Sequence, residues 1–303
     1  DKADLFPSDF MIKMPVPSNY MGQDYYFGQA DGGDDASKNS KHSPIVAITD
    51  HIPVHELKGT DTITAIPESL KEAVRTFILV IAIRSLRGED CAHNTMLVNI
   101  SHLKIHQNKL EFLIGEYYKE LDAALDSFSG LGPEKARQNM IINKLEVTFV
   151  KQFSIDEDYK SVFEKLKDAS SKVHVWAINQ SNKKEDGKEL DYSLYKENGL
   201  SAIVIGGHKL SRGLTLEGLS VSYFARNSKA YDTLMQMCRW FGYRPRYDDL
   251  CRVFLPQDST DWYSFISTVI RELYQELERM SRIGLPPSEF GLKVREHPGA
   301  MII

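Results

Sequence analysis

The sequence contains few cysteines and no long apolar run. Its three cysteines, Cys91, Cys238 and Cys251, are odd in number and lack C-x-x-C spacing, so neither a disulfide framework nor a zinc site is indicated. We therefore expect no metal site and a reducing, cytoplasmic environment. The longest apolar run, residues 77–83, is well short of the roughly 20 residues that a bilayer requires, which predicts a buried helix and no membrane partner.

The chain also lacks an excess of positive charge and the signatures of a complete ATPase. Its 37 basic and 42 acidic residues give a net charge of -5, which argues against wholesale coating of nucleic acid but allows a confined basic groove. It contains neither a GxxxxGKS or GxxxxGKT phosphate loop nor a DExx-type magnesium-binding run after a strand. The chain opens with Asp1 rather than methionine, so we expect it to be part of a longer protein.

Apolar runs alternate with helical patterns, and this order predicts an α/β fold with a parallel sheet. The expected strands are short apolar runs bounded by polar turns, as in strands that are buried on both faces. The expected helices carry apolar residues at helical spacing. Strands are expected at residues 95–101, 172–179, 201–207, 219–225 and 250–256, and helices at residues 67–88, 103–125, 227–243 and 260–282.

A glycine-rich segment follows one of the expected strands. Gly206, Gly207 and Gly213 lie at the carboxyl end of that strand, where parallel α/β sheets bind ligands. Glycines there let backbone N–H groups approach a phosphate or a nucleic-acid backbone, and Lys209 and Arg212 add positive charge. The alternative is a glycine-rich turn whose arginine pairs with a carboxylate at the edge of the core.

A second basic cluster belongs to the next expected helix and its C-terminal turn. It consists of Gln236, Arg239, Arg244 and Arg246. Gln236 and Arg239 are three residues apart and would share a helix face, whereas Arg244 follows the helix end that we expect at Gly242. Arginine matches phosphate with a planar fork and stays charged when desolvated, so the cluster predicts a polyanionic ligand. The alternative is pairing of these arginines with Asp248 and Asp249 at the surface.

We expect the two clusters to line one open face at the carboxyl ends of the parallel strands, because each follows a strand. Arg244 in particular should lie at the surface. Its removal should then cost less than about 1 kcal/mol of folding stability.

Together the two clusters resemble motifs of superfamily two helicases. The run "LSRGLTLEGLSVSYF" resembles their fifth motif, "QMCRWFGYR" resembles the sixth, arginine-bearing motif, and "TMLVNIS" stands where the first strand of the second RecA-like lobe would be. Cys238 replaces the glycine that precedes the arginine in the helicase pattern. The sequence from residue 206 to 250 is similar to that of the Z-one (Z1) domain family. This family is associated with endonucleases that carry a helicase-type ATPase.

This resemblance implies a RecA-like second lobe of a P-loop NTPase at residues 89–257, after an N-terminal linker and helical region at 1–88 and before a C-terminal helical extension at 258–303. It implies a DNA-dependent ATPase within a DNA endonuclease of restriction or defence type. ATP and Mg²⁺ would bind the full-length protein, the partners would be DNA and the ATPase lobe that carries the phosphate loop, and the isolated chain would bind no cofactor and not turn over ATP.

The resemblance also implies roles for individual residues. Arg239 and Arg244 would stabilise charge on the γ-phosphate, and Gln236 would orient them. The residues implied in contacts with nucleotide or nucleic acid are Gly206, Gly207, Lys209, Ser211, Arg212, Gly213, Thr215 and Arg246.

Two other readings stay open. The basic cleft could belong to a non-catalytic module that binds a phosphorylated partner or another lobe. The run "DHIPVHELK" offers Asp50, His51, His55 and Glu56 to a nuclease metal, but a solvated turn is the more economical reading because Pro53 would disturb a helix. Trp240 and Phe241 are expected to pack the helix against the sheet rather than to stack on bases.

Overall fold

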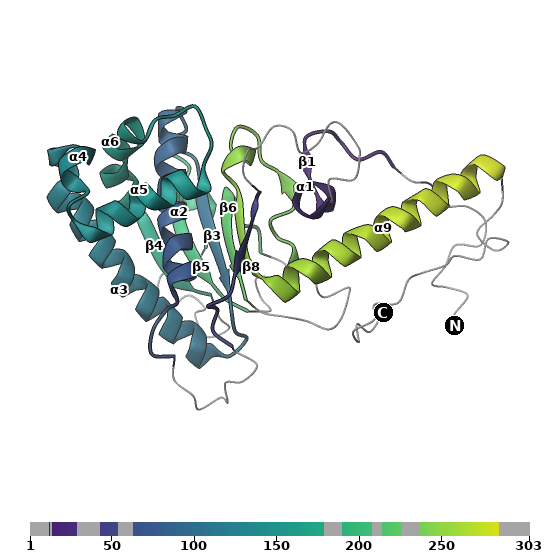
Figure 1. Ribbon diagram of the computed structural model, residues 1–303, viewed down its shortest axis with the longest axis horizontal. Coiled ribbons are helices and arrows are strands. Elements are labelled where there is room, and N and C mark those ends of the chain that lie inside the picture. The colour runs from purple at the N-terminus through teal and green to yellow at the C-terminus, as the bar shows by residue number, and fades with distance from the viewer. Residues whose placement is uncertain are drawn as a thin grey trace.

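A parallel six-stranded sheet forms the centre of the molecule. The computed structural model describes residues 12, 14–28, 43–53, 63–178, 190–207, 214–225 and 237–284. The strand order is β2-β8-β6-β3-β5-β4, and every neighbouring pair is parallel (Figure 1). The strands are β2 (Ile45–Ile48), β3 (Asn94–Asn99), β4 (Val173–Ala177), β5 (Ser201–Ile205), β6 (Leu219–Phe224) and β8 (Arg252–Pro256).

One face of the sheet is covered by a helical layer. Figure 1 shows these helices gathered on one side of the strands. Met96 and Val98 of β3 and Ile203 and Ile205 of β5 point into this layer and belong to the main apolar core. The helices are α2 (Glu68–Leu86), α3 (Lys104–Phe128), α4 (Pro133–Ala136), α5 (Met140–Gln152) and α6 (Tyr159–Ser170).

Helix α2 lies at the centre of this layer, as its sequence predicts. A helix that is apolar on every side is stable only when other elements surround it. Residues 77–83 are all buried, and the two arginines on the helix are enclosed together with polar partners. Arg75 donates to Thr148, Tyr117 and Glu68, and so ties α2 to α3 and α5.

Shorter elements and one long helix lie on the other face. The η3 turn (Tyr192–Tyr195) covers β3, with Tyr192 hydrogen-bonded to Thr95 at 2.8 Å. Near β6, Trp240 packs its ring against Phe224 at 5.7 Å and against Tyr263 at 5.8 Å. The elements of this side are α1 (Gln23–Phe27), β1 (Tyr20–Met21), β7 (Gly242–Tyr243), η4 (Asp248–Leu250) and α9 (Gln257–Ile283).

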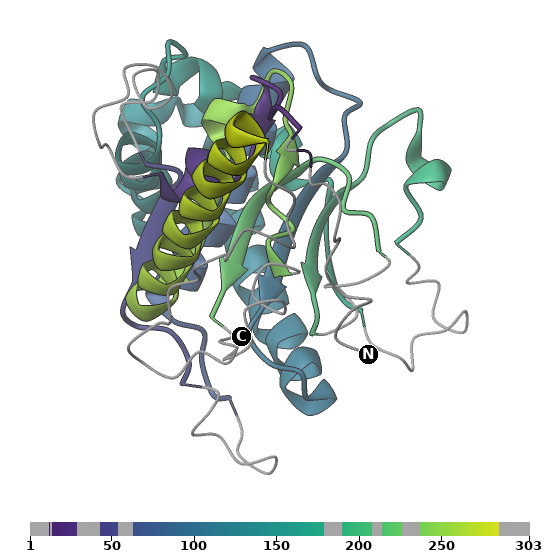
Figure 2. The same cartoon turned by 90° about the vertical axis from the view of Figure 1, so that its right-hand side faces the viewer.

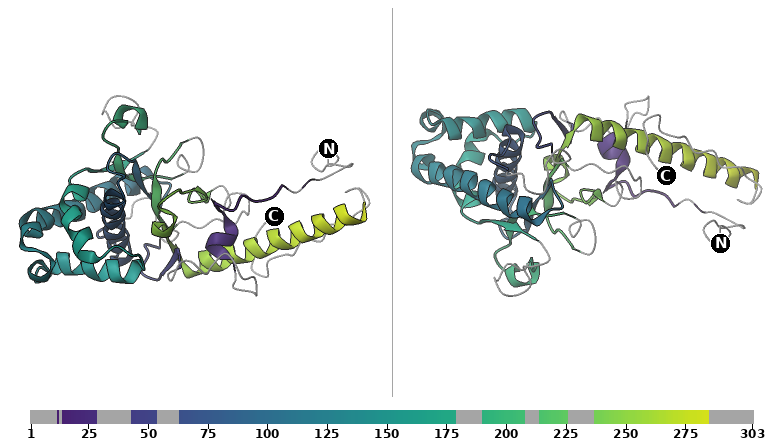
Figure 3. Two further views of the ribbon diagram at one scale, coloured as in Figure 1. Left: turned by 90° about the horizontal axis from the view of Figure 1, so that it is seen from above. Right: turned by 90° about the horizontal axis from the view of Figure 1, so that it is seen from below.

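Among the described residues, the first part of α9 packs against the α/β body. Its residues Tyr263 and Ile266 are buried, and the Tyr263 ring stacks on Phe27 of α1 at 5.1 Å. Figure 2 shows α9 crossing in front of the strands, and both views in Figure 3 show its second half extending away from the sheet.

The structure confirms the predicted α/β class and parallel sheet, and it shortens one expected helix. The elements before residue 89 are built into the same sheet and core, because β2 pairs with β8 and α2 lies beneath β6 and β3. The helix expected at residues 227–243 ends earlier: its last helical residue is Met237, and Gly242–Tyr243 form β7, which pairs antiparallel with β1. Residues 226–236 lie outside the described residues.

Candidate functional site

The carboxyl ends of β3, β5 and β6 form one edge of the sheet. The chain leaves β3 toward β4 and β5 but leaves β6 toward β8, so the direction of winding reverses between these two adjacent strands. In open α/β sheets such a reversal opens a crevice at the carboxyl ends, where ligands bind. Gly206 continues β5 at this edge, and its N–H donates to the Val98 carbonyl at 3.1 Å.

Gly207 lies directly against the loop that follows β3. A Cβ atom at this position would come within 2.9 Å of His102 Cα and 3.2 Å of the Ser101 carbonyl oxygen. Because both contacts are with backbone, only glycine permits this approach. The Ser101 hydroxyl in turn bonds His106 Nδ1 at 2.9 Å, and the Ser101 carbonyl accepts from Gln107 Nε2 at 3.0 Å.

Arg239 and Arg244 are brought together with the segment that leads into β6. Arg239 Nη2 donates to the Leu214 carbonyl. Arg244 Nε donates to the Leu219 carbonyl at 2.9 Å, and its Nη2 lies 3.4 Å from the Arg239 carbonyl. The described parts of the "LSRGLTLEGL" and "QMCRWFGYR" runs therefore form one contiguous unit.

The described members of the two clusters do not line one face at the carboxyl ends, which corrects our expectation. Arg244 contacts Leu219, the first residue of β6, whereas Gly206 and Gly207 follow the last residue of β5. Arg246 also lies at the amino end of the sheet, where its Nη2 donates to the Arg87 carbonyl at 3.0 Å. The physical reason is that the chain recrosses the sheet after β6, because β8 must also start at the amino edge.

Two further details of the arginine cluster differ from the sequence expectation. Arg239 lies beyond the last helical residue, in a turn closed by its own N–H to the Met237 carbonyl at 2.7 Å. Arg244 is half-buried rather than displayed at the surface, because its guanidinium donates to main-chain carbonyls, including that of Tyr243 at 2.9 Å.

Replacing Arg244 with alanine should therefore destabilise the fold by about 2 kcal/mol or more, since hydrogen bonds to charged groups contribute about 1.5–3 kcal/mol each. Urea denaturation of the variant and the parent would measure the change. A matched replacement of Arg137, an arginine of the helical layer that pairs with Glu134, should change the free energy of unfolding by less than about 0.5 kcal/mol. Equal stabilities for the Arg244 variant and the parent would show that these carbonyl contacts contribute nothing.

Neither Arg239 nor Arg244 has a carboxylate partner among the described residues. The buried arginines of α2 do: Arg75 pairs with Glu68 at 2.9 Å, and Arg84 pairs with Glu89 at 2.7 Å. Asp249, proposed above as a surface partner, instead pairs with Arg87 at 2.7 Å. Two half-buried guanidinium groups, on residues joined by a contact from Arg244 to the Arg239 carbonyl, thus carry positive charge that no described carboxylate neutralises.

The remaining sequence candidates divide into described and undescribed residues. Thr215 is exposed on the segment between Arg239's partner Leu214 and β6, and Trp240 is buried, which confirms its packing role. Gln236, Lys209, Ser211, Arg212, Gly213, His55 and Glu56 lie outside the described residues.

Asp50 has a structural role at the start of α2. One of its carboxylate oxygens accepts from the Ser69 N–H at 3.0 Å, so it caps the helix from the loop after β2. Burial alone would raise the pKa of this carboxyl, but the hydrogen bonds from Ser69 hold it below its usual value. Within the described ranges, no group of three His, Cys, Asp or Glu side chains is placed to hold a metal ion.

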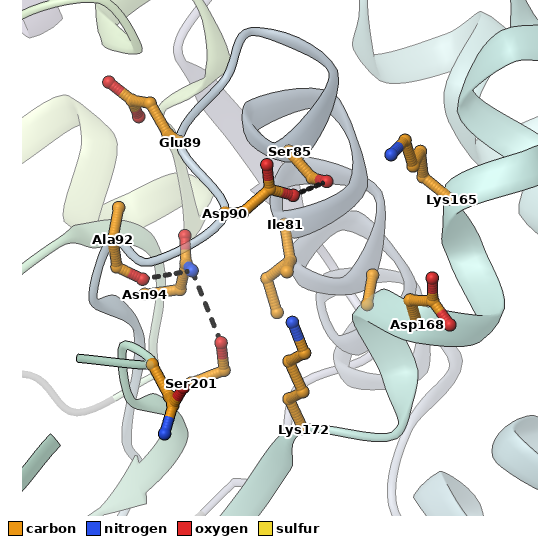
Figure 4. A pocket seen from close by; sticks show the side chains of 12 residues that line it. Ile81, Ser85, Glu89, Asp90, Ala92, Asn94, Lys165, Asp168, Lys172 and Ser201 are labelled. Atoms are coloured by element: carbon orange, nitrogen blue, oxygen red, sulfur yellow. Dashed lines mark hydrogen bonds between the residues drawn. The ribbon is translucent and has the colours of Figure 1, made fainter.

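A polar pocket of about 60 Å³ lies at the opposite, amino edge of the sheet, between the ends of α2 and α6. Figure 4 shows Asn94 and Ser201 on one side of it and Lys165, Asp168 and Lys172 on the other. The Asn94 amide donates to the Ala92 carbonyl at 3.0 Å and to Ser201 Oγ at 3.3 Å, and Ser85 donates to Asp90 at 2.5 Å. Because several of its polar groups already pair with one another, this pocket is a weaker ligand site than the carboxyl edge.

Comparison with protein families matches the Z1 domain over residues 69–302. The chain belongs to the Z1 domain family. The matched range begins at the start of α2 and includes β3 to β8 with both arginine-bearing runs, so this Z1 domain contains the whole of the described site. Comparisons with curated proteins and with solved structures found no match. Among the described helices of this Z1 domain, none has both the length and the apolar character of a membrane span.

Sequence reasoning missed four buried polar residues at the carboxyl edge. Asn99, Ser101, His106 and Gln107 are each at most 3% exposed. The available signal was the abrupt change from the apolar run "MLV" to polar residues at the end of a central strand, because polar side chains at that place are the ones that meet ligands.

Proposed function

We propose that this Z1 domain is the second, RecA-like lobe of a nucleic-acid-dependent ATPase of the superfamily two helicase type, within a DNA endonuclease. The observation that supports it most is the hydrogen bond from Arg239 to the Leu214 carbonyl. It joins the run that resembles the fifth helicase motif to the run that resembles the sixth. A lobe that couples nucleic-acid binding to ATP hydrolysis requires such a connection.

The charge of the arginine pair supports a phosphate-directed role. Arg239 uses one guanidinium nitrogen for Leu214, while its buried Nε has no partner among the described residues. A buried N–H without an acceptor costs free energy that an incoming anion would recover. An arginine placed in this way can neutralise charge that develops on a transferring phosphoryl group.

Arg244 has a different role in this proposal. Its contacts to the carbonyls of Leu219 and Arg239 fix the turn that carries Arg239, so it positions its neighbour and adds positive potential. Gly206 and Gly207 would follow the backbone of a nucleic-acid strand at the carboxyl edge, and the segment that runs from them to Thr215 would connect this strand contact to Arg239.

The other components of the reaction lie outside this lobe in the proposal. A partner lobe would supply the phosphate loop and the Mg²⁺ ligands, and ATP would bind between the two lobes. The assignment to an endonuclease, and to DNA rather than RNA, rests on the family resemblance alone.

The test is ATP hydrolysis by the full-length protein, measured with and without single-stranded DNA, duplex DNA and RNA. We expect DNA to raise the rate of phosphate release, because the segment from Gly206 to Thr215 would couple strand binding to Arg239 and Arg244. Hydrolysis that no nucleic acid changes would contradict the proposal. No hydrolysis together with tight binding of a phosphorylated protein would support the alternative of a non-catalytic assembly module.

A further inference from the structure

Two asparagines at opposite ends of the same central strand differ sharply in their hydrogen bonding. Asn94 begins β3 and is 4% exposed, and Asn99 ends β3 and is 2% exposed. The Asn94 carboxamide accepts from Arg84 at 2.6 Å and donates to the Ala92 carbonyl and to Ser201. The Asn99 carboxamide makes no hydrogen bond to any described residue, and its Oδ1 is fully enclosed.

Asn99 lies at the place in the sheet where a ligand is expected. It is paired with Phe224, the last residue of β6, and the Gly206 N–H bonds the carbonyl of the preceding residue, Val98. Its side chain points to the face opposite the helical layer, since Val98 points into that layer. Asn99 therefore occupies the reversal point between β3 and β6, beside the glycine pair.

Other buried polar atoms around this point also lack partners among the described residues. Ser222 of β6 is paired with Leu97 in the sheet, and its buried Oγ bonds no described group. On the other side of the Gly206–Gly207 turn, Gln107 Oε1 and His106 Nε2 are buried without a partner in the described part of the chain. Buried polar atoms are normally paired, so several orphans around one turn require an explanation.

A structural role does not explain Asn99. An unpaired buried carboxamide lowers stability, and an apolar side chain of similar shape would avoid the loss. Natural sequences keep a buried polar residue without partners where function requires it. Ligand contact accounts for both the residue type and its position.

We propose that the Asn99 carboxamide binds a nucleoside, through a base edge or a sugar hydroxyl, at the carboxyl ends of β3 and β6. This inference rests on the proposed function and names the part of the ligand that the carboxyl edge contacts. A carboxamide offers both a donor and an acceptor, and nucleobase edges present the same pair in complementary order.

The enclosed acceptor distinguishes a nucleoside from a phosphodiester. Asn99 Oδ1 needs a donor, which an amino or hydroxyl group supplies and a phosphodiester lacks. The nucleoside could belong to a nucleic-acid strand or to a free nucleotide, and we assign it to the strand because the reversal point adjoins Gly206 and Gly207, where the backbone is open to the close approach of a strand.

The experiment compares Asn99→Leu with Asn94→Leu in the full-length protein. Each variant replaces a buried carboxamide of β3 with an apolar side chain of similar shape. Binding of labelled single-stranded DNA, single-stranded RNA and ATP is measured by anisotropy or competition, and the melting temperature is measured by calorimetry. Asn99→Ala serves as a second, smaller variant if leucine does not fit.

Asn99→Leu should weaken strand binding roughly tenfold or more, as expected for the loss of a good contact to a base. Its melting temperature should not fall, and ATP affinity should stay unchanged. Asn94→Leu should show the reverse pattern, with a lower melting temperature and unchanged strand affinity of the folded protein, because it leaves Arg84 and Ser201 without their partner.

Other results have distinct meanings. Weaker ATP binding with unchanged strand binding would keep the nucleoside contact but move it to the nucleotide. Unchanged binding of every ligand by Asn99→Leu and Asn99→Ala would overturn the inference, while DNA-stimulated hydrolysis by the same variants would leave the proposed function standing. Lower melting temperatures for both Asn99→Leu and Asn99→Ala would overturn the inference and show that Asn99 has a structural role. A parent protein that binds neither strand nor nucleotide would overturn both proposals.

Discussion

Replacing Arg239 with alanine should slow DNA-stimulated ATP hydrolysis by the full-length protein on the order of a thousandfold, while the protein still folds. The side chain is half-buried, has one carbonyl partner and no carboxylate partner among the described residues, and lies outside the helix that ends at Met237. Few native interactions are therefore lost with it. In the assembled cleft, however, its guanidinium would meet the charge that develops on the transferring phosphoryl group.

The measurement is single-turnover hydrolysis at saturating ATP and DNA, so that chemistry is separated from binding. Arg239→Lys should restore little of the rate, because an ammonium group keeps the charge but cannot hold a carbonyl and a phosphate in one planar fork. Arg137→Ala, in the helical layer, is the matched control and should hydrolyse ATP at the parental rate. A near-normal rate for Arg239→Ala would show that this arginine only anchors the segment before β6.

The contrast between Arg239 and Arg244 shows what the sequence could and could not predict. Both belong to one motif-like run, and the family resemblance implied the same role for both. The structure separates them, because Arg244 bonds the Leu219 carbonyl across 25 residues of sequence, whereas Arg239 Nε has no partner among the described residues. No local pattern encodes such a bond, since a backbone carbonyl carries no residue identity.

The sheet itself was predictable for a simple reason. Strands β3, β5 and β6 are buried on both faces, so each contains a cluster of apolar residues, and residues 77–83 of α2 form a continuous apolar run. The early end of the helix before Arg239 was not predictable, because Gly242–Tyr243 leaves the helix to pair with β1, more than 220 residues earlier in the chain. The sequence around Gly242 does not show that this segment will pair with β1.

Buried charge explains a second feature that the sequence did not reveal, the joining of α2 to the sheet. Arg84 near the end of α2 is 4% exposed and donates to Glu89 at 2.7 Å, to the His93 carbonyl at 2.8 Å and to Asn94 at 2.6 Å. Its guanidinium also lies 4.1 Å from the centre of the Tyr247 ring. One side chain therefore fixes the end of α2, the start of β3 and the turn after Arg246.

Replacing Arg84 with alanine should accordingly cost about 3–5 kcal/mol of folding stability, the usual loss when one partner of a buried ion pair is removed. Glu89 would be left mostly buried, with Arg246 at 3.5 Å as its remaining cation, and Asn94 would lose its acceptor bond. Urea denaturation measures the change, and Arg84→Met tests its cause, because methionine keeps much of the apolar volume but none of the donors. We expect Arg84→Met to be nearly as unstable as Arg84→Ala. A methionine variant as stable as the parent would show that the volume of this side chain, and not its charge, holds α2 to β3.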